Sequence, residues 1–223
     1  MIKLKDITKI YRSKKSNVIA LNEINLNIPQ NRFVLIKGPS GCGKSTLLFT
    51  ISGMLKPSSG ELEVLGNKPF SLSEKQRTAF LSSQLGFVFQ SYYLIPYLTV
   101  LDNILLPART GNKLVTKEQA VSIAEELNLD HRLSHKPSEL SIGEKQRVAL
   151  ARAFIIQPKV ILADEPTGNL DPANTKKVLL QLAGYKQHGG TVIMVSHGNE
   201  ADDLADIIIQ LNNGKIIGIN QNN

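Results

Sequence analysis

The sequence predicts an α/β fold with a mixed β-sheet, an antiparallel β subdomain and an inserted α-helical subdomain. Three observations carry this prediction. A buried strand passes through a glycine-rich turn into a helix over 33–51, a second apolar strand at 159–163 ends in two carboxylates, and a largely helical block at 92–156 interrupts the alternation of strands and helices. Unbroken apolar strands between helices are typical of parallel sheets that are covered on both faces.

Before the helical block, the apolar pattern predicts strands over 1–7, 18–28, 33–36, 61–65 and 86–89. Tyr11 is expected in the polar loop between the first two strands. Helices are predicted from Lys44 through Ile51, and from Ser73, the expected N-cap, to Leu81.

Within the block, apolar positions at helical spacing predict helices over 99–106, 116–127 and 141–155, the second capped by Thr116. After the block, strands are expected at 159–163, 191–195, 207–211 and 215–219, with a helix over 171–187. Asn213-Gly214 is a hairpin signal that joins the last two strands.

Residues 38–45 match the phosphate-binding pattern G-x-x-x-x-G-K-S, with a strand before it and a helix after it. Its glycines let the backbone close around an anion, and the N–H groups at a helix N-terminus attract negative charge. Lys44 is expected to reach the outer phosphates, and the Ser45 hydroxyl to bind Mg²⁺. A glycine-rich turn without a ligand is the alternative, but the pattern and its context match together. The expected contacts with a nucleoside triphosphate are Gly38, Pro39, Ser40, Gly41, Cys42, Gly43, Lys44, Ser45 and Thr46.

Two carboxylates, Asp164 and Glu165, follow the strand at 159–163. Ligands of parallel sheets gather beyond the carboxyl ends of the strands, so both side chains are expected near the phosphates. Asp164 would hold Mg²⁺ opposite Ser45, and Glu165 would orient or deprotonate the attacking water. A helix cap is the alternative for such an acidic pair, but its pairing with the phosphate loop favours the catalytic roles.

His197 and Gln90 each follow a core strand and are expected at the same edge of the sheet. His197 could hydrogen-bond the γ-phosphate or position the water beside Glu165, although a lone histidine is more often structural. The amide oxygen of Gln90 is able to reach the metal or its water. The candidate catalytic residues are therefore Glu165, His197 and Lys44, and the candidate metal ligands are Ser45, Gln90 and Asp164.

The net charge is +7, and Cys42 is the one cysteine. The charge fits a nucleotide, a nucleic acid or an anionic membrane, and a nucleotide accounts for it without nucleic acid. A single cysteine excludes an internal disulfide and fits a reducing compartment. We find no leader peptide and no apolar run of ~20 residues, so we expect a soluble, cytoplasmic chain.

These motifs together resemble those of the ATP-binding cassette ATPases, over nearly the whole chain. Residues 140–147, L-S-I-G-E-K-Q-R, look like the signature segment of that family. The resemblance implies one domain over 1–223, with a P-loop NTPase core at 1–91 and 157–223 and a helical lobe at 92–156. It also implies ATP and Mg²⁺ as cofactors and a head-to-tail homodimer, in which the signature segment of one copy closes over ATP held by the other.

The resemblance implies further roles. Tyr11 looks like the aromatic residue that stacks on adenine, Gln90 like the metal-sensing residue and His197 like the switch histidine. Residues 169–171, which end in Asp171, are similar to the segment that crosses the dimer and touches the partner's site.

In the signature segment, Ser141, Gly143 and Glu144 would contact the partner's nucleotide, because N–H groups that open a helix form a second anion site. Two departures from the family pattern stand out. Ile142 replaces a glycine; if it points outward the N–H donors survive, and if its position needs a positive φ the strain is about 1–2 kcal/mol. Glu144 replaces the commoner glutamine and adds negative charge near phosphate. Asn31 also stands where the family often has glycine, and asparagine tolerates left-handed geometry.

The run A-D-E-P-T-G-N-L-D at 163–171, with 89–91 and 94–96, resembles the branch that drives lipoprotein release, macrolide-type efflux and antibiotic-peptide export. In that branch the cassette is often a separate subunit. The resemblance therefore implies an ATP-hydrolysing subunit that dimerises on ATP and powers a membrane permease from the cytoplasmic face.

The main alternative is a nucleotide-gated scaffold of a membrane or cell-wall machine, with little hydrolysis. A cassette that acts on ribosomes or DNA ranks lower, because such proteins tend to carry paired cassettes or long inserts. A small-molecule kinase or a GTPase also ranks lower, because such a function gives no role to residues 141–147 or to His197. An apolar patch beside Gln90 is expected either to accept a permease helix or to pack in the core of the lobe. Its members are Tyr92, Tyr93, Leu94 and Tyr97.

Overall fold

The computed structural model describes residues 1–12, 16–110 and 114–222 of the chain. Its larger sheet has six strands in the order β5-β6-β7-β3-β8-β9. All neighbours are parallel except β9, which runs antiparallel along one edge. The strands are β3 (Phe33–Lys37), β5 (Leu85–Val88), β6 (Val160–Asp164), β7 (Thr191–Val195), β8 (Ile207–Asn212) and β9 (Lys215–Gln221). The predicted mixed sheet is confirmed.

A smaller antiparallel sheet has the order β2-β1-β4. It consists of β1 (Ile2–Arg12), β2 (Asn17–Ile28) and β4 (Ser59–Val64). The prediction that Tyr11 lies in a loop is wrong. The pairing of β1 with β2 continues to Arg12 opposite Asn17, so Tyr11 lies in β1 opposite Val18. Polar composition misled the prediction, because an exposed hairpin end satisfies its backbone hydrogen bonds without an apolar face.

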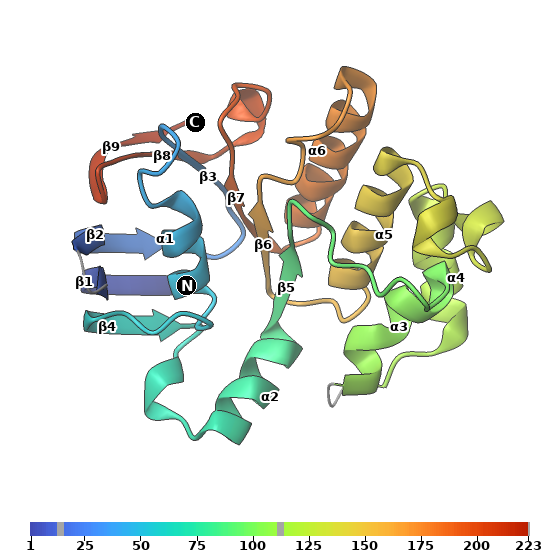
Figure 1. The fold of residues 1–223 in the computed structure, drawn as a ribbon, viewed down its shortest axis with the longest axis horizontal. Coiled ribbons are helices and arrows are strands. Elements are labelled where there is room, and N and C mark those ends of the chain that lie inside the picture. Colours follow the sequence, from blue (N-terminus) through green and yellow to red (C-terminus); the bar gives the residue numbers. More distant parts are fainter. Residues whose placement is uncertain (13–15, 111–113, 223) are drawn as a thin grey trace.

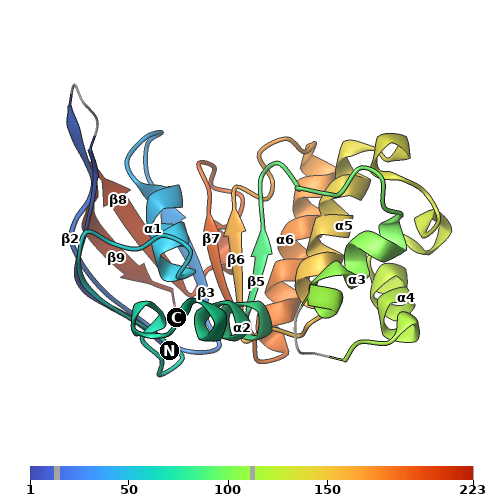
Figure 2. The ribbon, with the colours of Figure 1, turned by 60° about the horizontal axis from the view of Figure 1, so that its bottom comes forward.

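Helix α1 (Lys44–Ile51) lies between the two sheets, as Figures 1 and 2 show. Because successive side chains of a strand point to opposite faces, the central strands contribute to two cores. Phe33 and Leu35 of β3 lie in the core on the helical side, whereas Val34 and Ile36 lie in the core with α1 and the smaller sheet. The strand that leads into the phosphate loop is therefore held from both faces.

The remaining long helices are α2 (Glu74–Gln84), α3 (Val100–Thr110), α4 (Lys117–Glu126), α5 (Ile142–Phe154) and α6 (Pro172–Gln187), with short 3-10 turns η1 (Pro69–Ser71), η2 (Asp130–Arg132), η3 (Pro137–Glu139) and η4 (Asp202–Leu204). Helices α5 and α6 cover the other side of the larger sheet, α3 and α4 pack against α5 beyond them, and α2 leads into β5 (Figures 1 and 2). The predicted caps Ser73 and Thr116 are confirmed, since each accepts a hydrogen bond from the N–H three residues on. In the described part of the chain, every helix is too short or too polar to cross a bilayer.

Candidate nucleotide site

The phosphate loop (residues 38–45) is pressed against two neighbouring strands. A Cβ atom at Gly38 would lie 2.1 Å from the carbonyl oxygen of Leu211, and one at Gly43 would lie 2.3 Å from that of Ala20. Gly43 also has a φ of +108°. Glycine is the residue that fits such close approach and such a backbone angle. The shape of the loop is therefore set by its backbone.

Lys44 opens α1 directly after the loop. The residue is 5% exposed, and its ammonium group donates hydrogen bonds to the carbonyl oxygens of Gly38 and Pro39, at 2.8 and 2.9 Å. Its Nζ atom also lies 3.3 Å from Nδ1 of His197. A buried positive charge is thus held against the concave backbone of the loop, where phosphate oxygens would meet it.

Ser45 and Asp164 place two oxygen atoms side by side. The Ser45 hydroxyl donates a hydrogen bond to Oδ1 of Asp164 at 3.0 Å. Burial raises the pKa of the Asp164 carboxyl above its ordinary value. Hard oxygen donors of this kind fit Mg²⁺, which commonly uses one or two protein ligands together with phosphate oxygens and water. Within residues 1–12, 16–110 and 114–222, no group of three or more His, Cys, Asp or Glu side chains could hold a metal alone.

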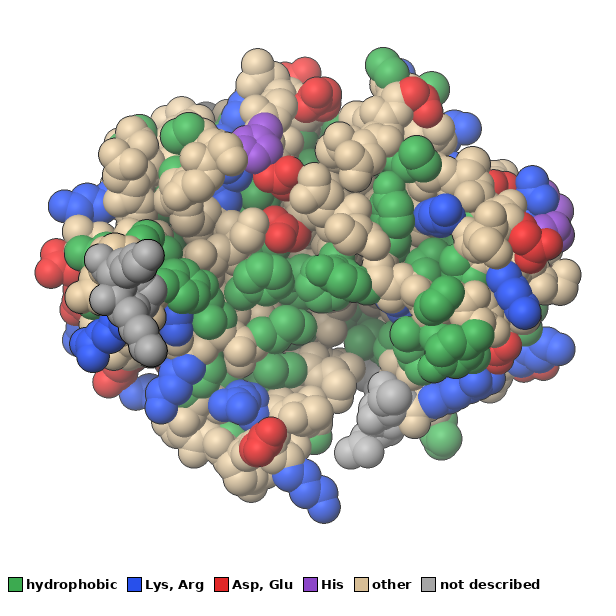
Figure 3. Space-filling model, viewed as in Figure 1, with side chains coloured by type: hydrophobic (Ala, Val, Ile, Leu, Met, Phe, Trp, Pro, Cys, Tyr) green, Lys and Arg blue, Asp and Glu red, His purple; other side chains and the backbone are tan. Residues whose placement is uncertain are grey.

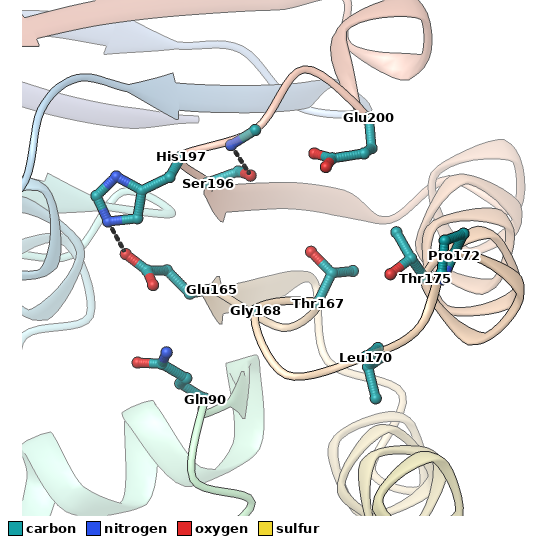
Figure 4. A pocket seen from close by; sticks show the side chains of 11 residues that line it. Gln90, Glu165, Thr167, Gly168, Leu170, Pro172, Thr175, Ser196, His197 and Glu200 are labelled. Atoms are coloured by element: carbon teal, nitrogen blue, oxygen red, sulfur yellow. Dashed lines mark hydrogen bonds and ion pairs between the residues drawn. The ribbon is translucent and has the colours of Figure 1, made fainter.

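Glu165, His197 and Gln90 come from the ends of three neighbouring strands and point toward one another (Figure 4). Nε2 of His197 is 2.5 Å from Oε1 of Glu165. Glu165 has a φ of +47°, and its N–H donates to the carbonyl oxygen of Val195 at 3.1 Å. All three side chains line a pocket of about 390 Å³. The carboxyl edge of the sheet therefore brings together the residues that the sequence placed there.

A second pocket, of about 420 Å³, includes the phosphate loop itself. It is also lined by Val18 and Ile19 of β2, which are 56% and 52% exposed, and by Asn213-Gly214. Tyr11 lies opposite Val18, with Lys9 Nζ 5.4 Å from the centre of its ring. Exposed apolar side chains beside the loop suit a flat ring attached to the phosphates.

The signature segment (residues 140–147) begins helix α5. Ser141 is the N-cap and forms a capping box with Glu144, in which each side chain accepts a hydrogen bond from the backbone N–H of the other residue, at 3.3 and 2.8 Å. Ile142 is the first helical residue and is 53% exposed. A helical position has a negative φ, so the replacement of glycine by Ile142 introduces no backbone strain.

The carboxylate of Glu144 turns back toward the protein. The residue is 8% exposed, and Nε of Arg132 donates a hydrogen bond to its Oε1 at 2.8 Å. Burial alone would raise the pKa of Glu144, but the hydrogen bonds from Ser141 and Arg132 lower it to about 2. Glu144 is therefore ionised and paired at the start of α5.

Asp171 is the N-cap of α6, where its Oδ1 accepts a hydrogen bond from the Asn174 N–H at 3.0 Å. The Asn174 amide lies against Gly143, because a Cβ atom on that glycine would come within 2.9 Å of the amide carbon. Oδ1 of Asn174 also accepts a hydrogen bond from Arg147 at 3.3 Å. Asn174 thus joins the segment 169–171 to the signature segment within one chain.

Sequence analysis gave no role to several residues that build the site. Thr167, within the run 163–171, and Ser196, next to His197, line the pocket at Glu165 (Figure 4), and their positions beside candidate site residues were the available signal. Arg132 and Asn174 pair with motif residues that are distant in the sequence. Only folding brings such partners together.

The tyrosines after Gln90 divide between surface and interior. Tyr93 and Tyr97 are 63% and 75% exposed, whereas Tyr92 is half-buried. Tyr92 and Tyr93 have left-handed φ values of +60° and +45°. Arg152, near the end of α5, donates hydrogen bonds to their carbonyl oxygens at 2.5 and 2.6 Å. The loop after Gln90 is therefore tied to the helix that begins at the signature segment.

The expected apolar patch is formed in part. Leu94 packs against the helical core, so that member is directed inward. Tyr93 instead meets Phe89 edge-on at 4.9 Å, and Phe89 stacks on Phe87 at 4.1 Å. On the face shown in Figure 3, hydrophobic side chains gather in a band over the region between α1 and β5.

A phosphate-binding loop between a strand and a helix, with acidic and histidine side chains at the ends of the neighbouring strands, defines a P-loop nucleoside triphosphatase. The family model described as ABC transporter matches residues 21–168. The chain belongs to the ABC transporter family. It is an ATPase subunit of that family, for which ATP is the nucleotide and Mg²⁺ its metal partner.

Relatives and a solved structure agree with this identification. The lipoprotein-releasing system ATP-binding protein LolD of Treponema denticola is 39% identical to this chain, and the match covers 97% of this chain and 97% of that protein. The macrolide export ATP-binding/permease protein MacB of Chlorobaculum tepidum is 36% identical over 97% of this chain, which spans 34% of that protein. A dimeric post-hydrolysis state of the ATP-binding cassette MJ0796 bound to ADP and Pi superposes with a TM-score of 0.93 at 36% identity, over 99% of this chain and 98% of that one. The predicted fold, family and branch are confirmed.

Proposed function

We propose that this chain powers a separate membrane permease as a homodimer that closes on ATP. The dimeric state of the similar cassette with ADP and Pi supports the dimer. The names of LolD and MacB support lipoprotein release, or export of antibiotic-like molecules, as the transport process. The subunit works at the cytoplasmic face of the membrane, where the permease holds it, and has no nucleic-acid partner.

One half of each ATP site lies within a single copy. The backbone and side chains of 38–46 hold the phosphates, and Lys44 neutralises the outer ones. Ser45 and Asp164 hold Mg²⁺, and Gln90 reaches the metal or its water. Bound there, the ion offsets negative charge on the phosphates and on the leaving group.

Glu165 takes the proton of the attacking water while the water oxygen bonds to the γ-phosphorus and ADP departs. The observation that carries this assignment is the His197–Glu165 contact of 2.5 Å. It fixes the carboxylate beside the phosphate loop. Nδ1 of the same imidazole lies 3.3 Å from Lys44 Nζ, so His197 is also within reach of the γ-phosphate that Lys44 would bind.

The other half comes from the second copy. The Ser141 hydroxyl and the backbone at Gly143 and Glu144 of one copy face the triphosphate held by the other. Asp171 reaches the partner's site, and Tyr11 stacks on the adenine within its own copy. ATP then completes the interface and stabilises the dimer by linkage, and two-fold symmetry makes two such sites. In this scheme the lobe that moves with the permease consists of residues 92–156. The nucleotide-binding core consists of residues 1–91 and 157–223.

The permease docks at the surface beside Gln90, where Tyr93 and Tyr97 are exposed. Replacing Tyr97 by Asp should abolish transport coupling in the assembled transporter and spare basal ATP hydrolysis by the isolated chain. Tyr97→Phe is the matched control, because it keeps the ring. Unchanged coupling in Tyr97→Asp would argue against docking at this surface.

The test of the whole proposal compares the wild type with Glu165→Gln. The substitution should lower phosphate release by about 10²-fold or more and leave ADP affinity unchanged. The variant should also form dimers with ATP and Mg²⁺ that are detectable by analytical ultracentrifugation. A variant that stays monomeric at saturating ATP, both alone and beside its permease, would contradict the shared site.

The second candidate is the nucleotide-gated scaffold, in which ATP acts as a clamp. The carboxylate on the first turn of α5, at Glu144, is the observation that favours it. On this account, wild type and Glu165→Gln would release phosphate equally slowly while both dimerise on ATP.

A further inference from the structure

The signature segment carries an apparent electrostatic conflict. The first turn of α5 offers N–H groups and the positive end of a helix dipole to an anion, which suits a triphosphate. The same turn contains the carboxylate of Glu144, which is ionised and whose charge opposes an incoming phosphate. At a separation of a few ångströms, one unpaired charge is enough to offset the partial charge of a helix end.

The structure resolves this conflict through a pairing outside the motif. Both oxygens of the Glu144 carboxylate are occupied: Oε2 accepts the Ser141 N–H at 2.8 Å, and Oε1 accepts Nε–H of Arg132 at 2.8 Å. His131 adds a more distant contact, with Nε2 3.8 Å from Oε1. Glu144 is also 8% exposed, so little of its charge faces solvent or a partner.

Arg132 is itself held in position. It ends the short turn η2, and its Nη1 donates a hydrogen bond to Nε2 of His135 at 3.2 Å. The carbonyl oxygen of His135 in turn accepts the Val100 N–H of α3 at 2.8 Å. The guanidinium is thus held between two partners, His135 and Glu144.

We propose that Arg132 is a positioning residue for the partner's ATP: it neutralises and turns away the Glu144 carboxylate, so that the first turn of α5 still attracts phosphate. Arg132 acts through Glu144 and does not itself touch the nucleotide. The proposal rests on the proposed function, in which the signature segment faces the ATP of the other copy.

The test uses full-length Glu165→Gln as the parent, so that ATP-bound dimers accumulate. Arg132→Gln, Glu144→Gln and the double variant are made in this parent, and dimer formation is titrated with ATP and Mg²⁺ by analytical ultracentrifugation. Arg132→Gln should need about tenfold more ATP to dimerise, because it leaves an unpaired carboxylate beside phosphate. Glu144→Gln should dimerise at least as well as the parent, since glutamine also completes a capping box.

Two readouts separate neutralisation from a general loss of structure. The double variant, Arg132→Gln with Glu144→Gln, should dimerise at an ATP concentration within about twofold of that needed by the parent, because neither charge remains. ADP affinity of the monomer, which uses the phosphate loop alone, should stay unchanged in every variant.

A second variant tests the same physics without removing the partner of Glu144. Ile142 is exposed at the first helical position, where an acidic residue is compatible with the helix dipole. Ile142→Glu should keep monomer stability and still weaken ATP-driven dimerisation about tenfold relative to Ile142→Gln. This result is accessible even if Arg132→Gln folds poorly.

Failure of the inference differs from failure of the proposed function. A parent that dimerises on ATP while Arg132→Gln and Ile142→Glu dimerise equally well would overturn the inference alone. A double variant that stays as weak as Arg132→Gln would do the same. A Glu165→Gln parent that remains monomeric at saturating ATP would instead overturn the proposed function, and the inference with it.

Discussion

The phosphate loop and the signature segment each lead into the N-terminus of a helix, but they are built in different ways. The loop is shaped by backbone: Gly38 and Gly43 touch the carbonyl oxygens of neighbouring strands, and Lys44 is buried between loop carbonyls. The signature segment is shaped by side-chain pairs, in which Ser141 caps α5 and Glu144 binds Arg132.

This difference teaches which half of the site is complete in one copy. The loop is fixed by contacts that no side chain could replace, so it can hold phosphates without a partner. The signature segment exposes only Ser141 and Ile142 at the start of α5, and the charge of its first turn depends on one ion pair. We therefore expect substitutions in the loop to abolish nucleotide binding, and substitutions at the signature segment to change assembly.

The largest effect is expected from Gly43→Ala. Its Cβ atom would lie 2.3 Å from the carbonyl oxygen of Ala20, at a φ of +108°. We expect a loss of about 3 kcal/mol of stability and no measurable ADP binding, by thermal unfolding and isothermal titration calorimetry. Gly41→Ala is the matched control, because Gly41 also has a positive φ, of +75°, but its Cβ would meet no atom within 4 Å. Equal behaviour of the two variants would contradict a loop fixed by close contact.

Arg152→Met tests the opposite end of α5. The guanidinium holds the carbonyl oxygens of Tyr92 and Tyr93, two residues with left-handed φ, and its burial lowers the pKa of Arg152. Loss of these hydrogen bonds should cost about 2–3 kcal/mol in urea unfolding. Arg109→Met is the control and should cost under ~1 kcal/mol, because Arg109 makes an exposed pair with Asp102. Equal losses of unfolding free energy in the two variants would mean that the turn at Tyr92 and Tyr93 is stable without the hydrogen bonds from Arg152.

The sequence predicted the phosphate-loop half well because that half is local. Gly43, Lys44 and Ser45 are neighbours in one motif, and Asp164, Glu165 and His197 each follow an apolar strand that places them at a common edge. Periodicity and strand ends were sufficient to bring them together. The division of the chain into core and lobe, and the role of each site residue, remain predictions.

The signature half could not be predicted in the same detail. Its motif was visible, but the partner of Glu144 is Arg132, which lies in a 3-10 turn without any pattern. The orientation of Ile142 was likewise open until the helix start was known. Tyr11 was misplaced because the pairing of β1 with β2 continues into a polar stretch, and polar composition does not reveal such pairing.

The pH dependence of stability should separate Glu144 from an ordinary surface carboxylate. Its pKa is lowered from 4.5 to about 2 in the fold, so its contribution is present above pH 4.5 and is lost as pH falls from 4.5 to about 2. Glu144→Gln should therefore be less stable than the wild type by on the order of 2 kcal/mol at neutral pH, and this difference should vanish near pH 2. A difference that stays constant with pH in urea unfolding would rule out the ion pair as its source.

The smallest effect is expected from Ile142→Gly, which restores the residue that the family pattern prefers. Ile142 is 53% exposed at the first position of α5 and already has helical backbone angles. Glycine should therefore cost only about 0.5 kcal/mol through chain entropy, with ATP-driven dimerisation in the Glu165→Gln parent unchanged within about twofold. Set beside Gly43→Ala, this exchange measures how differently the two regions depend on glycine: one backbone requires it, and the other gains nothing from it. A tenfold improvement in dimerisation would show that the isoleucine obstructs the partner's nucleotide after all, and would place steric fit above charge at this helix end.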